Sequence, residues 1–194
     1  MTLWAIALLL PLIFSGCAAW NGSALQEPAA AAAGATTAPQ APQAWPPYLA
    51  TYHFSLGVLF SQDEIHDEAI KEFEAARQYD PQSPEIVAEL ASAYAEKGDF
   101  QKAIAVCVES LQDNPDDVNL RMILGGLYMT SRDLKNAVVQ YRRVIDLDPQ
   151  NTNAHLYLGT IYGDARQYPE AFTAFRNLLT IDPDHLMGNY YLGK

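Results

Sequence analysis

Histidine, cysteine and clustered acidic residues are the side chains here that could bind a metal ion or provide a nucleophile and its base. No two of the four histidines have the spacing of metal ligands, and no serine lies in the strand-turn-helix context of a hydrolase nucleophile. The acidic run Asp146-Leu147-Asp148 lacks the glycine and the distal glutamate of a calcium-binding loop. We therefore predict no catalytic residue, no metal site and no cofactor, and we expect a protein that is not an enzyme.

The secondary-structure elements that carry these residues can be predicted from a repeat in the sequence. Four prolines stand 34 residues apart, at Pro81, Pro115, Pro149 and Pro183. A fixed period of this length indicates an array of one structural unit, which buries its core against its neighbours. With Ala50 as position 1, the units are residues 50–83, 84–117, 118–151 and 152–185, and a partial fifth unit is 186–194.

Each unit predicts two helices that pack against each other. Leucine recurs at position 7, a small residue at position 8, alanine at position 20, and a large apolar residue or cysteine at position 24. Positions 4, 7, 8 and 11 share one helical face, and positions 20, 24 and 27 share another. We expect the small residues at positions 8 and 20 to allow a close helix crossing. Ser83 before Pro84 predicts a helix start, and Asp99 and Asp133 could cap second helices.

The repeat register assigns packing roles to two of the histidines and to one cysteine. His53 and His155 both occupy position 4, so we interpret them as packing residues. Cys107 occupies position 24 of the second unit, where the other units carry an aromatic ring. We therefore expect Cys107 to be a buried small apolar residue.

The recurring leucine, small residue and tyrosine, followed by alanine, an aromatic residue and proline, resemble the tetratricopeptide repeat (TPR) over residues 50–183. The resemblance implies an all-α, right-handed superhelical solenoid of antiparallel helix hairpins, with four complete units and a partial fifth. In that family, positions 2, 5, 9, 12 and 13 face a concave groove. The groove residues that follow are Phe54, Val58, Ala88, Ser92, Met122, Gly126, Met129, Leu156, Thr160 and Tyr190.

An apolar groove of this kind suits an extended protein segment or an amphipathic helix, and no small-molecule substrate is expected. The alternative is that some of these side chains only contact neighbouring helices. The net charge of −11 disfavours nucleic acid as a partner, because an acidic surface repels phosphates.

The N-terminal region predicts targeting. Residues 3–14 form an apolar run of 12 residues, which fits a signal peptide and is shorter than the roughly 20 residues of a membrane-spanning helix. The following Ser15-Gly16-Cys17 resembles the lipobox of bacterial lipoproteins. That resemblance implies a signal peptide over 1–17, lipidation of Cys17, and a membrane anchor at the periplasmic face of the outer membrane. An uncleaved anchor in the inner membrane is the alternative.

Residues 18–47 are rich in Ala, Pro and Gln without an apolar period, which predicts a disordered linker before the TPR body at 48–194. The function hypothesis is a membrane-tethered scaffold of the bacterial envelope that binds a protein partner. The alternative is the N-terminal part of a longer secretion, pilus-assembly or polysaccharide-export component, or of a longer enzyme. We expect the array to continue, because Tyr190, Leu192 and Gly193 repeat the first-helix pattern.

Overall fold

The computed structural model describes residues 47–193, and all regular elements within that range are α-helices. The predicted all-α solenoid of helix hairpins is confirmed. The signal sequence, Cys17 and the linker up to residue 46 lie outside the described residues. The helices are α1 (Pro47–Gln62), α2 (His66–Tyr79), α3 (Pro84–Glu96), α4 (Phe100–Asp113), α5 (Val118–Thr130), α6 (Leu134–Leu147), α7 (Thr152–Asp164), α8 (Tyr168–Ile181) and α9 (Leu186–Leu192).

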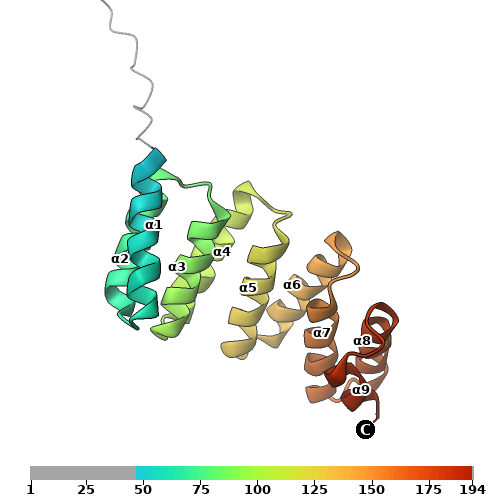
Figure 1. The fold of residues 1–194 in the computed structure, drawn as a ribbon. Coiled ribbons are helices and arrows are strands. Elements are labelled where there is room, and N and C mark those ends of the chain that lie inside the picture. The colour runs from blue at the N-terminus through green and yellow to red at the C-terminus, as the bar shows by residue number, and fades with distance from the viewer. Residues whose placement is uncertain (1–46, 194) are drawn as a thin grey trace, which may run out of the picture. The chain divides into compact units, whose positions relative to one another are not determined.

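The helices stack in chain order as antiparallel hairpins. Figure 1 shows α1, α3, α5 and α7 side by side in one layer, with α2, α4, α6 and α8 in a second layer behind them. Each helix packs mainly on the one before and the one after it, and the first helices also touch directly from α1 to α3 and from α3 to α5. Such nearest-neighbour packing is how a solenoid builds one continuous core from short units.

A side-chain cap starts the first helix of every later unit. The residues Ser83, Asp117, Asn151 and His185 each accept a hydrogen bond from the backbone N–H three positions on, at 3.3, 2.9, 3.0 and 3.2 Å. These bonds satisfy amide groups that have no partner inside the helix. The cap at Ser83 was predicted, whereas the cap that His185 makes through Nδ1 was not.

The second helices are capped less regularly. Asp133 accepts from the N–H of Asn136 at 3.2 Å, as predicted. The prediction for Asp99 was wrong, because its side chain makes no capping bond. Its carboxylate lies 3.3 Å from the Lys102 ammonium instead, so it is engaged by a lysine of the first turn.

In the core of each hairpin, the residue at position 8 of the first helix packs against the residue at position 24 of the second helix. A Cβ atom added to Gly57, Gly125 or Gly159 would lie 2.6, 2.7 or 2.5 Å from the ring at position 24 of the same unit. These glycines therefore make room for an aromatic ring from the second helix. In the second unit the pair is Ala91 with Cys107, both fully buried, so a larger residue at position 8 is matched by a smaller one at position 24.

Candidate protein-binding surface

The apolar candidates on the first helices are half-buried and belong partly to the core. Phe54 and Val58 pack against the N-terminal core cluster, and Met122, Met129 and Leu156 pack against the C-terminal one. The Phe54 ring lies 5.8 Å from that of Phe73, and the Tyr141 hydroxyl donates to the Met129 sulfur at 3.4 Å. Contacts with neighbouring helices therefore use part of each side chain, and part remains open to solvent.

The remaining candidates are small or polar, with one exposed aromatic residue. Ala88, Ser92, Gly126 and Thr160 are half-buried. The Thr160 hydroxyl donates to the carbonyl oxygen of Leu156 at 2.9 Å, so its hydrogen bond is made within its own helix, α7. Tyr190 on α9 is 52% exposed, which makes it the most accessible member of the set.

The charges on this face are all acidic. The family positions that line a groove hold no lysine or arginine in any of the four units. They do include Glu85, Glu96 and Asp164, which are exposed at the ends of α3 and α7. The only charges carried by these positions are therefore negative.

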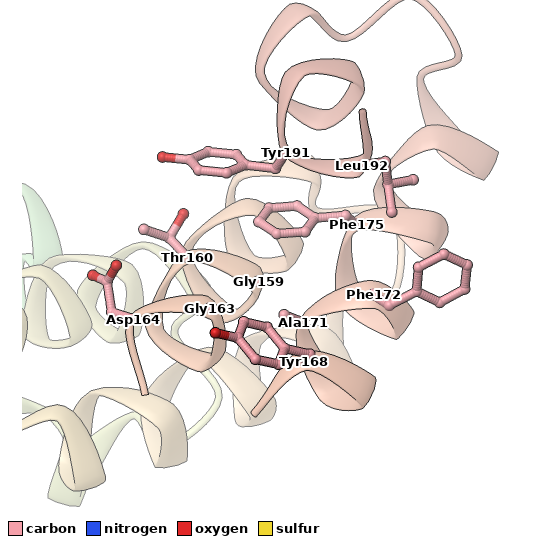
Figure 2. Close-up of a pocket in the computed structure, with 10 residues that line it drawn as sticks. All are labelled: Gly159, Thr160, Gly163, Asp164, Tyr168, Ala171, Phe172, Phe175, Tyr191 and Leu192. Carbon is pink, nitrogen blue, oxygen red and sulfur yellow. The ribbon is translucent and has the colours of Figure 1, made fainter. Parts of the chain in front are cut away.

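A cavity of about 430 Å³ lies at the C-terminal end, between α7, α8 and α9 (Figure 2). Its α8 wall is formed by Ala171, Phe172 and Phe175, and Tyr191 closes it from α9. Thr160 is the member of the predicted groove set that lines it. Phe54 lines a smaller cavity of about 140 Å³ near the first unit.

Sequence reasoning missed the C-terminal cavity. Tyr168 and Phe172 occupy positions 17 and 21, and the residues at these positions in the second and third units are also apolar, so the sequence does not mark a cavity here. Both residues are strongly exposed here, at 66% and 54%. Only the three-dimensional arrangement shows that no other part of residues 47–193 covers these two rings.

The histidines at position 4 have packing roles. His155 is 5% exposed, and its Nε2 lies 3.2 Å from the carbonyl oxygen of Pro149. The Nδ1 of His53 lies 2.7 Å from the Glu72 carboxylate. Between residues 47 and 193, no group of three or more His, Cys, Asp or Glu side chains is arranged to hold a metal ion.

Cys107 is completely buried, in agreement with its predicted packing role. Removal from water disfavours the thiolate and raises the pKa of the thiol to about 12. Because the thiolate is the reactive form, Cys107 is inert in the folded protein.

Within the described part of the chain, the structure holds no helix with both the length and the apolar character needed to cross a bilayer.

Comparison with known proteins agrees with the repeat architecture. A family model described as tetratricopeptide repeat matches residues 62–127, and a second, described as TPR repeat, matches residues 125–165. Together the two models span more than half of the 194 residues. No curated protein sequence matches the chain.

Several solved structures share the fold at low sequence identity. MamA from Desulfovibrio magneticus is 20% identical, with a TM-score of 0.66 over 74% of this chain and 81% of that one. YrrB, described as a TPR protein with an unusual peptide-binding site, is 20% identical, with a TM-score of 0.64 over 75% of each chain. A tetratricopeptide repeat protein from Parabacteroides merdae is 16% identical, with a TM-score of 0.69 over 75% of this chain and 58% of that one. The chain belongs to the tetratricopeptide-repeat family.

Proposed function

We propose that this protein is a non-enzymatic scaffold of the bacterial cell envelope that is tethered to a membrane and binds a segment of a partner protein. The observation that carries the proposal is the uncharged strip at position 5 of the first helices. Phe54, Met122 and Leu156 recur there in register on α1, α5 and α7, and each is only half-buried. Stacked first helices align such residues into a continuous surface, as solenoid proteins use for binding.

The chemistry of the strip favours one kind of partner. Methionine adapts its shape to different apolar surfaces, so Met122 in the strip, together with Met129 at position 12 of the same helix, suits a segment with apolar side chains. Exposed Glu85, Glu96 and Asp164 lie on the same face without a compensating lysine or arginine at the groove positions. We expect the bound segment to carry basic residues beside its apolar ones, since complementary charges steer association and fix register.

The membrane tether rests on the sequence that precedes the described residues. The lipobox-like Ser15-Gly16-Cys17 supports attachment of a lipid to Cys17, with the body held on the periplasmic side of the outer membrane. Two or more acyl chains suffice for stable anchoring, at about 0.8 kcal/mol per buried methylene group.

Substitution Cys17→Ser tests the tether. The variant should leave the membrane fraction and should not incorporate a radiolabelled fatty acid. Unchanged membrane partition together with an unchanged mass would reject lipidation and favour the inner-membrane anchor.

Site-directed photo-crosslinking tests partner binding in the intact envelope. A photoreactive amino acid at position 122 or 156 should give a discrete adduct, and Met122→Glu with Leu156→Glu should abolish binding of the protein identified in that adduct. Position 139 is the matched control, because Val139 is 53% exposed on a second helix, α6. Far-UV circular dichroism checks whether the variants remain folded. Equal crosslinking at 122, 156 and 139 would exclude the strip as the binding surface.

A further inference from the structure

A cavity of about 380 Å³ lies at the third joint of the solenoid, where α6, α7 and α8 meet. Its apolar lining includes Ile145, Leu158 and Ala174, and two residues of opposite charge, Arg142 and Glu170, also line it. A cavity of about 330 Å³ lies at the equivalent place in the first joint, between α2, α3 and α4. The hollow between successive second helices therefore recurs with the repeat.

The hydroxyl group of Tyr162 is a buried polar group without a partner at the third joint. Tyr162 lines the cavity and is 8% exposed, and no group among residues 47–193 forms a hydrogen bond with its hydroxyl oxygen. Leaving a buried hydroxyl unpaired costs free energy. An unpaired hydroxyl beside a cavity therefore points to a ligand that pairs with it.

The equivalent tyrosine of the first joint shows which groups match this position. Tyr94 occupies the same repeat position, and its hydroxyl donates to the carboxylate of Glu74 on α2. The Lys102 ammonium of α4 lies 5.3 Å from the centroid of the same ring. Tyr94 is thus paired with one carboxylate and one ammonium group, from the second helices that flank α3.

The third joint carries these two charges in exchanged places. Position 25 is Arg142 instead of Glu74, and position 19 is Glu170 instead of Lys102. The Arg142 guanidinium lies 5.9 Å from the centroid of the Tyr162 ring. Neither charged residue forms an ion pair with any residue between 47 and 193. The carboxylate that accepts from the tyrosine in the first joint is therefore replaced by a cation, and both charges remain available.

The third joint also lacks the ion pair that crosses the first one. In the first joint, Arg77 of α2 and Glu109 of α4 approach to 2.9 Å. Their equivalents are Ile145 and Asn177, which line the cavity of the third joint and cannot form such a pair. An uncrossed, mostly apolar space with a few polar groups is typical of small-molecule sites.

We propose that this cavity binds a small zwitterion with an apolar side chain, of the chemical class of an α-amino acid. The ligand carboxylate takes the role that Glu74 has in the first joint, accepting a hydrogen bond from the Tyr162 hydroxyl beside the Arg142 guanidinium. The exposed Arg142 side chain can move to admit it. The ligand ammonium group pairs with Glu170, and its side chain packs on the apolar lining.

The two charges separate this ligand from other occupants. An ion of a single sign would be repelled by one of the two charged residues that line the cavity. Residues 2–46 contain one carboxylate, Glu27, and no lysine or arginine, so they cannot present neighbouring opposite charges. The second joint has Val108 and Asn136 at positions 25 and 19, so no equivalent site is expected there. The site does not involve the position-5 strip and is independent of the proposed function.

Isothermal titration calorimetry with L-leucine tests the site in the full-length, detergent-solubilised protein. Leucine should show saturable binding, and Tyr162→Phe or Arg142→Gln should weaken it at least tenfold. Arg176→Gln should leave it unchanged and is the matched control, because Arg176 occupies position 25 on α8 and does not line this cavity. Without ligand, Tyr162→Phe should unfold at the same or a higher temperature than the unaltered protein, because it removes an unpaired hydroxyl.

Two leucine derivatives test the two charges separately. N-acetyl-leucine lacks the ammonium group, and leucinamide lacks the carboxylate, so both should bind more weakly than leucine. Glu170→Gln should weaken binding of leucine but not of N-acetyl-leucine, and Arg142→Gln should weaken binding of leucine but not of leucinamide.

Absence of leucine binding, or equal binding by the Tyr162→Phe variant, would overturn the proposal. Binding of an acetylated and amidated Lys-Leu-Glu peptide without binding of leucine would assign the cavity to a protein segment and also overturn it.

Discussion

Gly125 lies against the ring of Tyr141, and a Cβ atom built on the glycine would stand 2.7 Å from that ring. The same relationship joins Gly57 to Phe73 and Gly159 to Phe175. In these hairpins an aromatic ring of the second helix packs directly against the backbone of the first helix. Because interiors are close-packed, a methyl group at such a contact forces the ring or the helix to move.

Gly125→Ala should destabilise the protein by about 1–3 kcal/mol, because it overpacks this contact. Gly126→Ala is the matched control, since its added Cβ would meet only the Tyr141 hydroxyl at 3.9 Å. The control should be neutral or stabilising by up to about 1 kcal/mol, because alanine favours a helix over glycine. Urea denaturation followed by circular dichroism measures both, and equal effects would contradict the proposed contact.

Cys107→Phe should also destabilise the protein, since Ala91 replaces glycine beneath that position. Adding Ala91→Gly should recover much of the loss, although the glycine itself costs about 0.5–1 kcal/mol in a helix. A double-mutant cycle should therefore show a favourable coupling of at least about 0.5 kcal/mol between the two substitutions. Additive effects would mean that positions 8 and 24 do not compensate each other in volume.

Asp117→Ala should lower the free energy of unfolding by about 1 kcal/mol, because Asp117 caps α5 through the N–H of Leu120 at 2.9 Å. Asp99→Ala is the comparison, since Asp99 starts α4 without a capping bond. Its loss should be smaller, as it removes only an exposed ion pair with Lys102. A larger effect at Asp99 than at Asp117 in thermal unfolding would refute this ranking of the caps.

The joint between α2 and α3 contributes a pH-dependent interaction. The Lys97 ammonium donates to the Asp67 carboxylate at 2.5 Å, and that hydrogen bond, helped by the lysine charge, lowers the pKa of Asp67 below 3.8. A carboxyl group with a lowered folded pKa stabilises the fold above its unfolded pKa, and this contribution is lost as pH falls through the folded pKa.

Lys97→Met should return the pKa of Asp67 towards 3.8, as followed by NMR titration of the carboxyl carbon. Lys71→Met is the control, because Lys71 pairs with Glu68 on the surface of α2. The pKa of Asp67 should not respond to it. An unchanged pKa in the Lys97 variant would show that the ion pair does not form in solution.

The sequence by itself determined the repeat, the hairpins and most helix starts. Each unit of 34 residues contains the complete pattern of leucine, a small residue, alanine and proline at fixed places. The signal for the repeat is therefore local. Caps such as Ser83 and Asp133 are equally local, since their partners lie three residues away. Asp99 shows the limit of that reasoning, because a nearby lysine competes for the same carboxylate.

Only the tertiary structure shows which residues contact one another across the helices. The period places Gly125 and Tyr141 in one unit, but only the crossing of α5 and α6 shows that the ring lies on the glycine. The candidate strip was predicted by position, and the structure shows that Phe54 and Leu156 divide their surface between the core and solvent. The C-terminal cavity has no signature of its own, because Tyr168 and Phe172 look like the covered residues of earlier units. Their exposure depends on which residues pack over α8 in the assembled stack, and no single repeat encodes this.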